Sequence, residues 1–303
     1  MSGIATRFAG AAVGIAASRL VPPLDDDVHP VARFGSTMTQ VEQFLWQDDR
    51  RAGVLYAAAG AGIAASTGRA VGSTAAVTAI CAAGAQLRTT ATEIAEMLER
   101  SDLDSARRSL PALVGRDPSA LDASGIAAAV IESVAENMVD AVFAPATWAV
   151  VAGAPGAAAH RALNTMDAMV GRRNDRYENF GWAAARADDI ANLVPARLFA
   201  LAVAATAPRR SREVFDAVRR DASAHPSPNA GVAEAAMAGA LGVELGGPLR
   251  YGDVAEERPT LGTGPRPDER DLLRAVDVAR RTEDLLIGAL AVGAALTFVR
   301  GRR

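Results

Sequence analysis

The sequence lacks lysine altogether, although it contains 32 arginines among its 303 residues. Without lysine the chain has no residue that can form a Schiff base, which excludes pyridoxal-phosphate enzymes and class I aldolases. The Walker A lysine of P-loop nucleotide sites is absent for the same reason. Any phosphate that the protein binds must therefore be held by arginine, by backbone amides or by a bound cation.

Cysteine and histidine are also scarce. The single cysteine, Cys81, excludes a disulfide framework and a cysteine-ligated metal cluster. The three histidines, His29, His160 and His225, lie too far apart in the sequence to indicate a zinc site. The formal net charge of −3 gives no basic surface of the kind that nucleic acid requires, so we expect no nucleic-acid partner.

Charged residues are nearly missing from several apolar segments, which together predict helices in a lipid bilayer. Residues 8–18 resemble a signal peptide, but the further apolar segments downstream favour a retained anchor. Residues 53–66 and 71–87 predict a helical hairpin with a turn at 67–70, in which glycines such as Gly60 let the two backbones approach closely. The alternative is a buried helix pair in a soluble α-helical protein.

The second half of the chain is less regular. Residues 141–159 and 193–207 are apolar but are separated by several arginines, so we expect them to be re-entrant or to pack inside the protein. Proline, glycine and charged residues predict a linker over 252–270. The helix that Asp268 can cap ends in an apolar segment at 285–299, which indicates a C-terminal membrane anchor.

No segment alternates polar and apolar residues over a useful length, and no repeat of roughly 20–50 residues occurs. We therefore predict an all-α, multi-pass membrane protein with a polar, partly cytoplasmic central region. Arginines on both sides of the predicted hairpin place its flanking segments in the cytoplasm. The predicted parts are N-terminal membrane helices over 1–88, a catalytic core with buried or re-entrant helices over 89–252, and a linker with a C-terminal helix over 253–303.

The most informative polar pattern lies between residues 124 and 140. Glu132, Glu136 and Asp140 recur every four residues, which places them on one face of a helix. Two glutamates at this spacing repel each other unless a positive charge lies between them. A divalent cation or an arginine cluster is therefore the expected partner, and a solvated acidic face is the alternative.

Further carboxylates and amides occur in apolar surroundings, namely Asn164 with Asp167, and Asp188 and Asp189 with Asn192. Oxygen ligands of this kind suit Mg²⁺, and arginines near them suit phosphate or carboxylate groups. The alternative for the aspartate pair is the first turn of a helix with a salt bridge to arginine. A block with proline and glycine adds three more polar groups, which are His225, Asn229 and Glu234.

Four long strings of the sequence are distinctive: HPVARFG (29–35), VGRDPSALDASGIAAAVIESVAENMVDAVFAP (114–145), GAPGAAAHRALNTMDAMVGRRNDRYENFGWAAARADDIANLVPARL (153–198) and HPSPNAGVAEAAMAGALGVELGGPLRYG (225–252). These strings resemble the CobD/CbiB family of cobalamin biosynthesis, in the right order from about residue 25 to residue 252. The sequence departs from the family pattern at a few positions, such as Pro118 where threonine is common and Arg172 where an aromatic residue often stands.

The resemblance implies a multi-pass protein of the cell membrane that acts late in adenosylcobalamin assembly. It implies that cobyric acid is joined to aminopropanol, free or as its phosphate, through an amide at the f propionate of the corrin ring. The reaction is then an ATP- and Mg²⁺-dependent synthesis of ligase type, and its product is cobinamide or cobinamide phosphate. Other enzymes of the pathway are possible partners on the cytoplasmic face.

For this reaction the polar residues above receive candidate roles. Two other classes stay open: a Mg²⁺-dependent membrane enzyme of prenyltransferase type, and a non-enzymatic corrinoid-binding or transport protein. The catalytic candidates are Glu132, Glu136, Asp140, Asp188 and Asp189, and the candidate metal ligands are Glu132, Glu136, Asp167 and Asp188. The candidates for substrate and phosphate binding are Arg116, Asn137, Asn164, Arg186, Asn192, Arg197, His225, Asn229 and Glu234.

Overall fold

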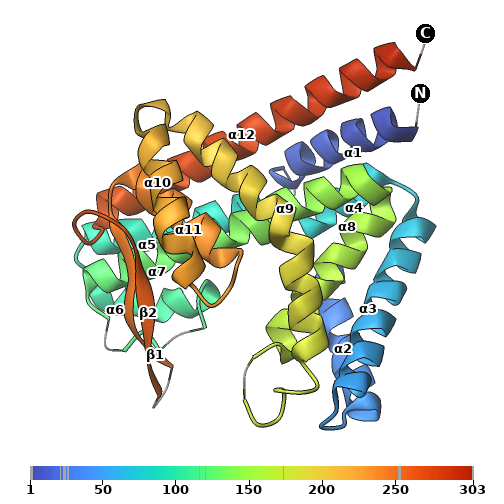
Figure 1. Cartoon of the computed structure of the whole chain (residues 1–303), viewed down its shortest axis with the longest axis horizontal. Coiled ribbons are helices and arrows are strands. Elements are labelled where there is room, and N and C mark those ends of the chain that lie inside the picture. Colours follow the sequence, from blue (N-terminus) through green and yellow to red (C-terminus); the bar gives the residue numbers. More distant parts are fainter. Residues whose placement is uncertain are drawn as a thin grey trace. The chain divides into compact units, whose positions relative to one another are not determined.

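The computed structural model describes residues 3–20, 22, 25, 27–115, 117–119, 121–172, 174–251 and 254–301, and this part of the chain is mostly helical (Figure 1). Its α-helices are α1 (Gly3–Ser18), α2 (Pro30–Leu45), α3 (Arg50–Val71), α4 (Thr74–Cys81), α5 (Gly84–Glu99), α6 (Leu103–Ser109), α7 (Ala123–Met138), α8 (Ala144–Val170), α9 (Trp182–Thr206), α10 (Ser211–Asp221), α11 (Ala230–Leu241) and α12 (Glu269–Arg300). The remaining elements are short 3₁₀ turns at Leu110–Ala112, Pro208–Arg210 and Ala222–Ala224, a π-helical turn at Val139–Phe143, and the strands β1 (Glu244–Tyr251) and β2 (Val254–Gly262).

The chain forms two compact units, each assembled from segments that lie far apart in the sequence. Helices α9 and α12 each contribute residues to both units. The sequence predicted three parts, over 1–88, 89–252 and 253–303, each continuous in the chain. That division stays a prediction. Unit 1 comprises Met1–Ala83, Asp140–Pro195 and Leu286–Arg303, and unit 2 comprises Gly84–Val139 and Ala196–Leu285.

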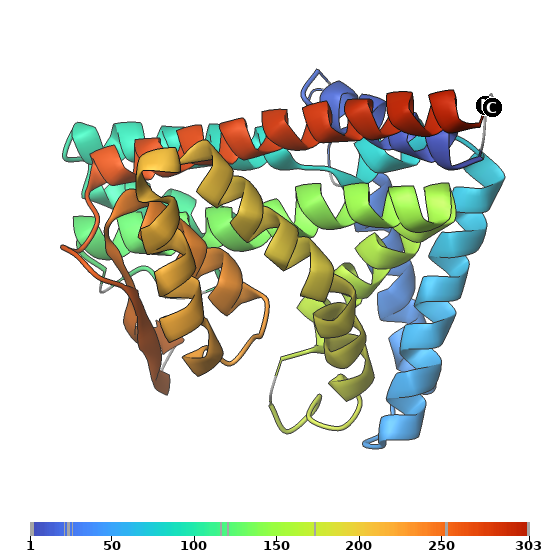
Figure 2. The ribbon, with the colours of Figure 1, turned by 45° about the horizontal axis from the view of Figure 1, so that its top comes forward.

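In unit 1, α3 packs mainly along α8, and α4 packs mainly against α1 (Figure 2). The prediction that 53–66 and 71–87 form one hairpin was therefore wrong. Helix α3 continues through the expected turn and ends at Val71, and the following Gly72 has a φ of 71° and caps the helix in the left-handed conformation. The second expected arm is divided, because α4 ends at Cys81 and Gly84 begins a helix of unit 2.

Close backbone packing through glycine does occur in unit 1, but with a different neighbour. A Cβ atom at Gly68 of α3 would lie 2.7 Å from the carbonyl oxygen of Ala154 in α8. Helix α8 itself bends at Gly153, whose φ of 69° and ψ of −153° lie outside the helical region, and Pro155 follows the bend. Small residues therefore set the fit between α3 and the bend of α8.

Unit 2 is built around α7, which is buried along most of its length. The Asp122 carboxylate accepts a hydrogen bond of 2.7 Å from the Gly125 amide and caps the first turn. The α-helical pattern ends at Met138, and the chain continues in a π-helical turn. The division between the units falls within this turn, so Glu132 and Glu136 belong to unit 2 and Asp140 belongs to unit 1.

Strands β1 and β2 form an antiparallel hairpin that packs against α10 and α11 in unit 2 (Figure 1). The sequence predicted a linker over 252–270 and no strand, and this was wrong over Val254–Gly262. The register shifts between Leu245 and Gly247, and Gly246 and Gly247 have φ angles of 77° and 89°. A bulge of this kind interrupts the alternation by which a strand is recognised in a sequence.

Among the described residues, two helices are long and apolar enough to cross a membrane by length and composition, namely α9 and α12. The most apolar stretch of α12 is only 17% buried and that of α9 is 50% buried. Exposed side chains on these helices include Ile190 and Val194 on α9 and Val292 and Leu296 on α12. This is weak evidence for a membrane protein, because the core helix of a soluble protein can have the same length and composition.

Candidate functional site

A network of carboxylates and amides lies inside unit 1. Asp140 accepts hydrogen bonds from two amide side chains, that of Asn164 at 3.0 Å and that of Asn192 at 3.1 Å. The Asn192 amide also donates to Asp188 at 3.1 Å, and its oxygen lies 2.8 Å from Nε2 of His160. These five residues, the unit 1 cluster, come from the π-helical turn, α8 and α9.

One oxygen of the unit 1 cluster is left without a partner. Asp188 is 9% exposed, and its Oδ1 atom has no hydrogen-bond partner among the described residues. An unsatisfied buried carboxylate oxygen costs free energy unless a cation or a ligand group reaches it. The cluster therefore offers one strong acceptor beside oxygens that the asparagines already orient.

Two further aspartates surround this cluster. Burial and the charge of Asp189 raise the pKa of Asp167 to about 6. Asp189 forms an ion pair of 3.8 Å with Arg186, whose side chain is largely exposed. For Asp188 and Asp189 the sequence left a salt bridge to arginine as the alternative. Asp189 forms such a salt bridge, whereas Asp188 accepts a hydrogen bond from Asn192.

A cavity of about 420 Å³ in unit 1 is lined in part by residues of the string HPVARFG. Pro30 and Phe34 of α2 form part of its wall, together with apolar residues of α3 and α4. Arg33 and Arg161 contribute the two cationic groups, and Arg161 also donates a hydrogen bond of 3.1 Å to Asn164. The cavity therefore combines an apolar wall with arginines, one of which contacts a residue of the unit 1 cluster.

A second polar cluster lies in unit 2, where α7, the turn before α11 and α11 itself meet. Ligand atoms of Glu136, His225 and Glu234 all lie within 4.8 Å of one another. Glu132 is one helical turn before Glu136, and its Oε1 accepts a hydrogen bond of 2.8 Å from the Gly246 amide of β1. Sequence reasoning selected all four side chains, but it did not predict that they meet.

Arg258 of β2 completes this unit 2 cluster, and sequence reasoning missed it. Its Nη1 atom lies 3.3 Å from Nε2 of His225. Arginine only donates hydrogen bonds, so Nε2 is the acceptor in this contact. Nδ1 faces the Ser227 backbone, 3.1 Å from its amide nitrogen and 3.2 Å from its carbonyl oxygen. Burial and Arg258 lower the pKa of His225, which favours the neutral ring.

The acidic side of the unit 2 cluster is strongly buried. Glu234 is 1% exposed, and its Oε1 atom has no hydrogen-bond partner among the described residues, although Nε2 of His225 lies 3.6 Å away. Burial raises the pKa of Glu234, and the charges of Glu136 and Glu132 raise it further. The cluster holds more negative than positive charge and therefore attracts protons or a cation.

The other predicted site residues of unit 2 lie in separate contacts. Asn137 donates to the Ser133 carbonyl at 2.9 Å within α7, and Arg197 donates to Asn229 at 2.9 Å. Arg116 lies outside the described residues. A cavity of about 740 Å³ in unit 2 is lined by arginines that sequence reasoning did not select, because they are spread over the chain: Arg209, Arg210, Arg274 and Arg281.

The fold and these clusters define a mostly helical protein in which carboxylates, amides, imidazoles and arginines provide the buried polar chemistry. The chain belongs to the CobD/CbiB family, since the family model described as CobD/Cbib protein matches residues 11–279. This match covers both clusters and supports a role in cobalamin biosynthesis. The family resemblance inferred from the sequence is thereby confirmed.

Individual relatives agree with the family match. The chain is 46% identical over 265 residues to a cobalamin biosynthesis protein CobD of Mycobacterium tuberculosis, covering 83% of this chain and 85% of the relative. It is 50% identical over 203 residues to the protein of that name from Rhodobacter capsulatus, covering 66% of this chain and 64% of the relative. A third relative of that name, from Geobacter metallireducens, is 39% identical over 260 residues, covering 79% and 81%. No solved structure matches the chain.

Proposed function

We propose that this protein joins the f propionate of cobyric acid, or of its adenosyl form, to the amine of aminopropanol or aminopropanol phosphate. The product is cobinamide or cobinamide phosphate. The observation that carries the proposal is the family match over residues 11–279, which spans the unit 1 and the unit 2 cluster. Substrates with carboxylate, amine and phosphate groups suit the buried carboxylates and arginines of the two units.

The chemistry requires activation of the propionate, because a carboxylate is a poor acyl donor at neutral pH. In the proposed reaction the propionate oxygen attacks the γ-phosphate of ATP, which gives an acyl phosphate and ADP. The amine nitrogen then attacks the acyl carbon, the C–N bond forms, and inorganic phosphate leaves with the C–O bond electrons. The protein must therefore neutralise phosphate charge, align the reactants and exclude water.

The unit 1 cluster suits the binding of Mg²⁺ with ATP. Mg²⁺ prefers oxygen ligands, and Asp188 offers an oxygen that has no hydrogen-bond partner in the described part of the chain, beside the Asp140 carboxylate. Asn164 and Asn192 orient these carboxylates through their amides. A bound Mg²⁺ would supply charge neutralisation for the phosphates.

Other side chains of the unit have separate roles in the proposal. Asp167 has a pKa of about 6, so it is suited to accept a proton from the ammonium form of the amine near neutral pH. Arg33 and Arg161 line the cavity of unit 1, where they would contact phosphate or propionate oxygens. In unit 2 the cavity lined by four arginines provides a second surface for an anionic group.

We also propose that the protein spans the plasma membrane more than once. Helices α9 and α12 have the required length and composition, and both expose apolar side chains. ATP is available only on the cytoplasmic side, so the clusters must be reached from the cytoplasm.

The reaction is tested with the purified full chain in detergent, supplied with cobyric acid, aminopropanol phosphate, ATP and Mg²⁺. We expect a corrinoid whose mass corresponds to the amide, formed only when ATP is present. Asp188→Asn is expected to lower kcat by roughly 100-fold, and Asp175→Asn, which alters an exposed aspartate of the same unit, is its matched control. Wild type that forms no amide would show that the proposed reaction is wrong.

The location of the reacting groups is tested separately from the reaction. If Asp188→Asn keeps full activity, the unit 1 cluster is not the site. In cells that lack the protein, supplied cobinamide should restore growth under cobalamin limitation and cobyric acid should not. Rescue by cobyric acid would instead favour a transport or binding role.

A further inference from the structure

The unit 2 cluster contains a group of side chains that none of the steps above uses. Glu136 of α7, His225 of the turn before α11 and Glu234 of α11 place one possible ligand atom each within 4.8 Å of the other two. His225 and Glu234 are almost fully buried. The three residues lie 89 and 9 positions apart in the sequence, so only the fold brings them together.

The His225 ring directs Nε2 at the carboxylates. Nδ1 faces the Ser227 backbone, 3.2 Å from its carbonyl oxygen and 3.1 Å from its amide nitrogen, so that carbonyl would hold a proton on Nδ1 while Nε2 binds a metal. Nε2 faces Oε1 of Glu234 at 3.6 Å. Two acceptors at this distance repel each other unless a proton or a cation lies between them.

Several carboxylates gather in the cluster. Those of Glu132, Glu136 and Glu234 act on one another, and Arg258 is a cationic group beside them. Carboxylates this close attract a proton or a cation. Oε1 of Glu234, which has no hydrogen-bond partner among the described residues, is the second observation that indicates a missing cation.

We propose that Glu136, His225 and Glu234 bind a divalent first-row transition-metal ion such as Zn²⁺ or Mn²⁺ rather than Mg²⁺. Imidazole nitrogen together with carboxylate oxygen is a donor set that favours transition metals, whereas Mg²⁺ prefers oxygen alone. The proposal goes beyond amide synthesis and does not depend on it.

Arg258 has a specific role in this proposal. Its Nη1 atom contacts the same Nε2 lone pair that the metal needs. The guanidinium therefore satisfies the imidazole when the metal is absent and competes with the metal for that nitrogen. Removing the guanidinium should strengthen metal binding, whereas a purely structural charge network would only be weakened by the same change.

The test measures metal binding directly, without substrates. The full chain in detergent is stripped with a chelator, dialysed against Zn²⁺, Mn²⁺ or Mg²⁺, and analysed for bound metal; Mn²⁺ binding is also followed by electron paramagnetic resonance. We expect one Zn²⁺ or Mn²⁺ per chain at this site, retained in the presence of excess Mg²⁺. Glu234→Gln and His225→Gln should each weaken binding roughly 100-fold.

Two controls make the outcome decisive. Glu213→Gln alters an exposed glutamate of unit 2 and should bind the metal as wild type does. Arg258→Gln should bind it more tightly, a gain that misfolding cannot imitate. The proposal is overturned if no stoichiometric Zn²⁺ or Mn²⁺ binds, if Glu234→Gln binds it unchanged, or if Arg258→Gln weakens binding while its circular dichroism is that of wild type. Amide synthesis can fail or succeed independently of each result.

Discussion

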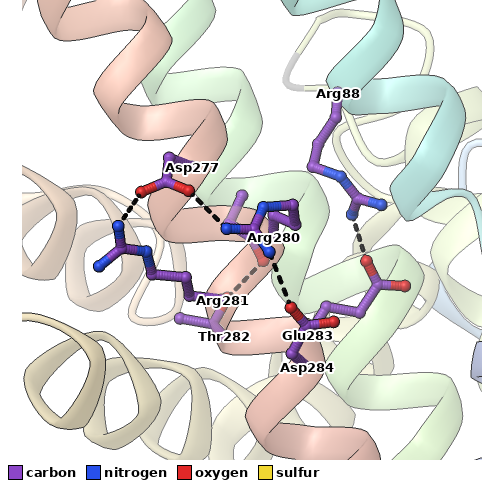
Figure 3. A network of polar contacts seen from close by, with 8 residues as sticks. Arg88, Asp277, Arg280, Arg281, Thr282, Glu283 and Asp284 are labelled. Carbon is purple, nitrogen blue, oxygen red and sulfur yellow. Dashed lines mark hydrogen bonds and ion pairs between the residues drawn. The ribbon is translucent and has the colours of Figure 1, made fainter.

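The buried ion pair between Arg88 and Glu283 allows a quantitative test of how unit 2 is held together. Arg88 of α5 reaches Glu283 of α12, and the two side chains are 13% and 0% exposed (Figure 3). Removing Arg88 leaves the Glu283 carboxylate in the interior without its arginine. Loss of one partner of a buried pair typically destabilises a protein by about 3–5 kcal/mol.

The neighbouring ion pairs on α12 provide an internal comparison. Arg280 pairs with Asp277 at 2.8 Å and with Asp284 at 3.1 Å, and these side chains are 40–53% exposed (Figure 3). Exposed pairs contribute about 0–1 kcal/mol each because water screens them. We therefore expect Arg88→Met to be much more destabilising than Arg280→Met, although both substitutions remove an arginine that is paired with α12 carboxylates.

The assay is thermal unfolding in detergent, followed by circular dichroism at 222 nm. Arg88→Met should lower the midpoint by about 5–15 °C and Arg280→Met by no more than a few degrees. The double variant Arg88→Met/Glu283→Leu should recover most of the loss, since an apolar pair can replace a buried ion pair at little cost. Equal midpoints for Arg88→Met and Arg280→Met, or no recovery in the double variant, would refute this reasoning.

Three further predictions concern packing, pH and the membrane. Gly62→Ala should stabilise α3 by about 0.5–1 kcal/mol, because nothing lies within 4 Å of a Cβ there. Gly68→Ala should destabilise α3, because it places a methyl group 2.7 Å from a backbone oxygen of α8. Thermal unfolding of the two variants compares these effects. Asp167 has a pKa of about 6 in the folded protein, against an ordinary value of 3.8, so its ionisation lowers the free energy of unfolding as pH rises through this window. Asp167→Asn should therefore be more stable than wild type at pH 7.5, by of the order of 2 kcal/mol, and the difference should shrink towards pH 4. In inside-out vesicles, a membrane-impermeant maleimide should label Asp104→Cys but not Leu296→Cys; equal labelling would contradict a bilayer around α12.

The helical class of the protein follows from the sequence, but the packing partners of the helices do not. Apolar segments and caps predict where helices form, and His29 and His225 do have the extended backbone expected of residues before proline. Neighbouring apolar segments were expected to pair with each other. Instead α3 packs along α8, which lies much later in the chain, because the bend at Gly153 creates the surface that fits Gly68.

The candidate site was predictable in residue type and only partly in grouping. The four-residue spacing of Glu132, Glu136 and Asp140 predicted that they share one face of a helix. That spacing did not predict the π-helical turn that follows Met138. A π-turn adds a residue within the helix and so changes the direction of every later side chain. Arg258 could not be selected from the sequence, because nothing marks one arginine of a bulged hairpin among 32.

The absence of lysine gives the two clusters their different chemical preferences. In a lysine-free chain the fixed positive charge near a buried carboxylate is arginine, whose planar guanidinium cannot approach from every side. In unit 1 the amides of Asn164 and Asn192 orient the Asp140 oxygens, and carboxylate oxygens suit a hard oxygen-preferring ion such as Mg²⁺. In unit 2 the imidazole of His225 adds a nitrogen donor and Arg258 competes for it, so a transition metal fits and its affinity depends on an arginine. Exchanging the donor types, with His225→Asn in unit 2, should therefore shift the metal preference of that cluster from Zn²⁺ towards Mg²⁺ while leaving the unit 1 cluster unchanged.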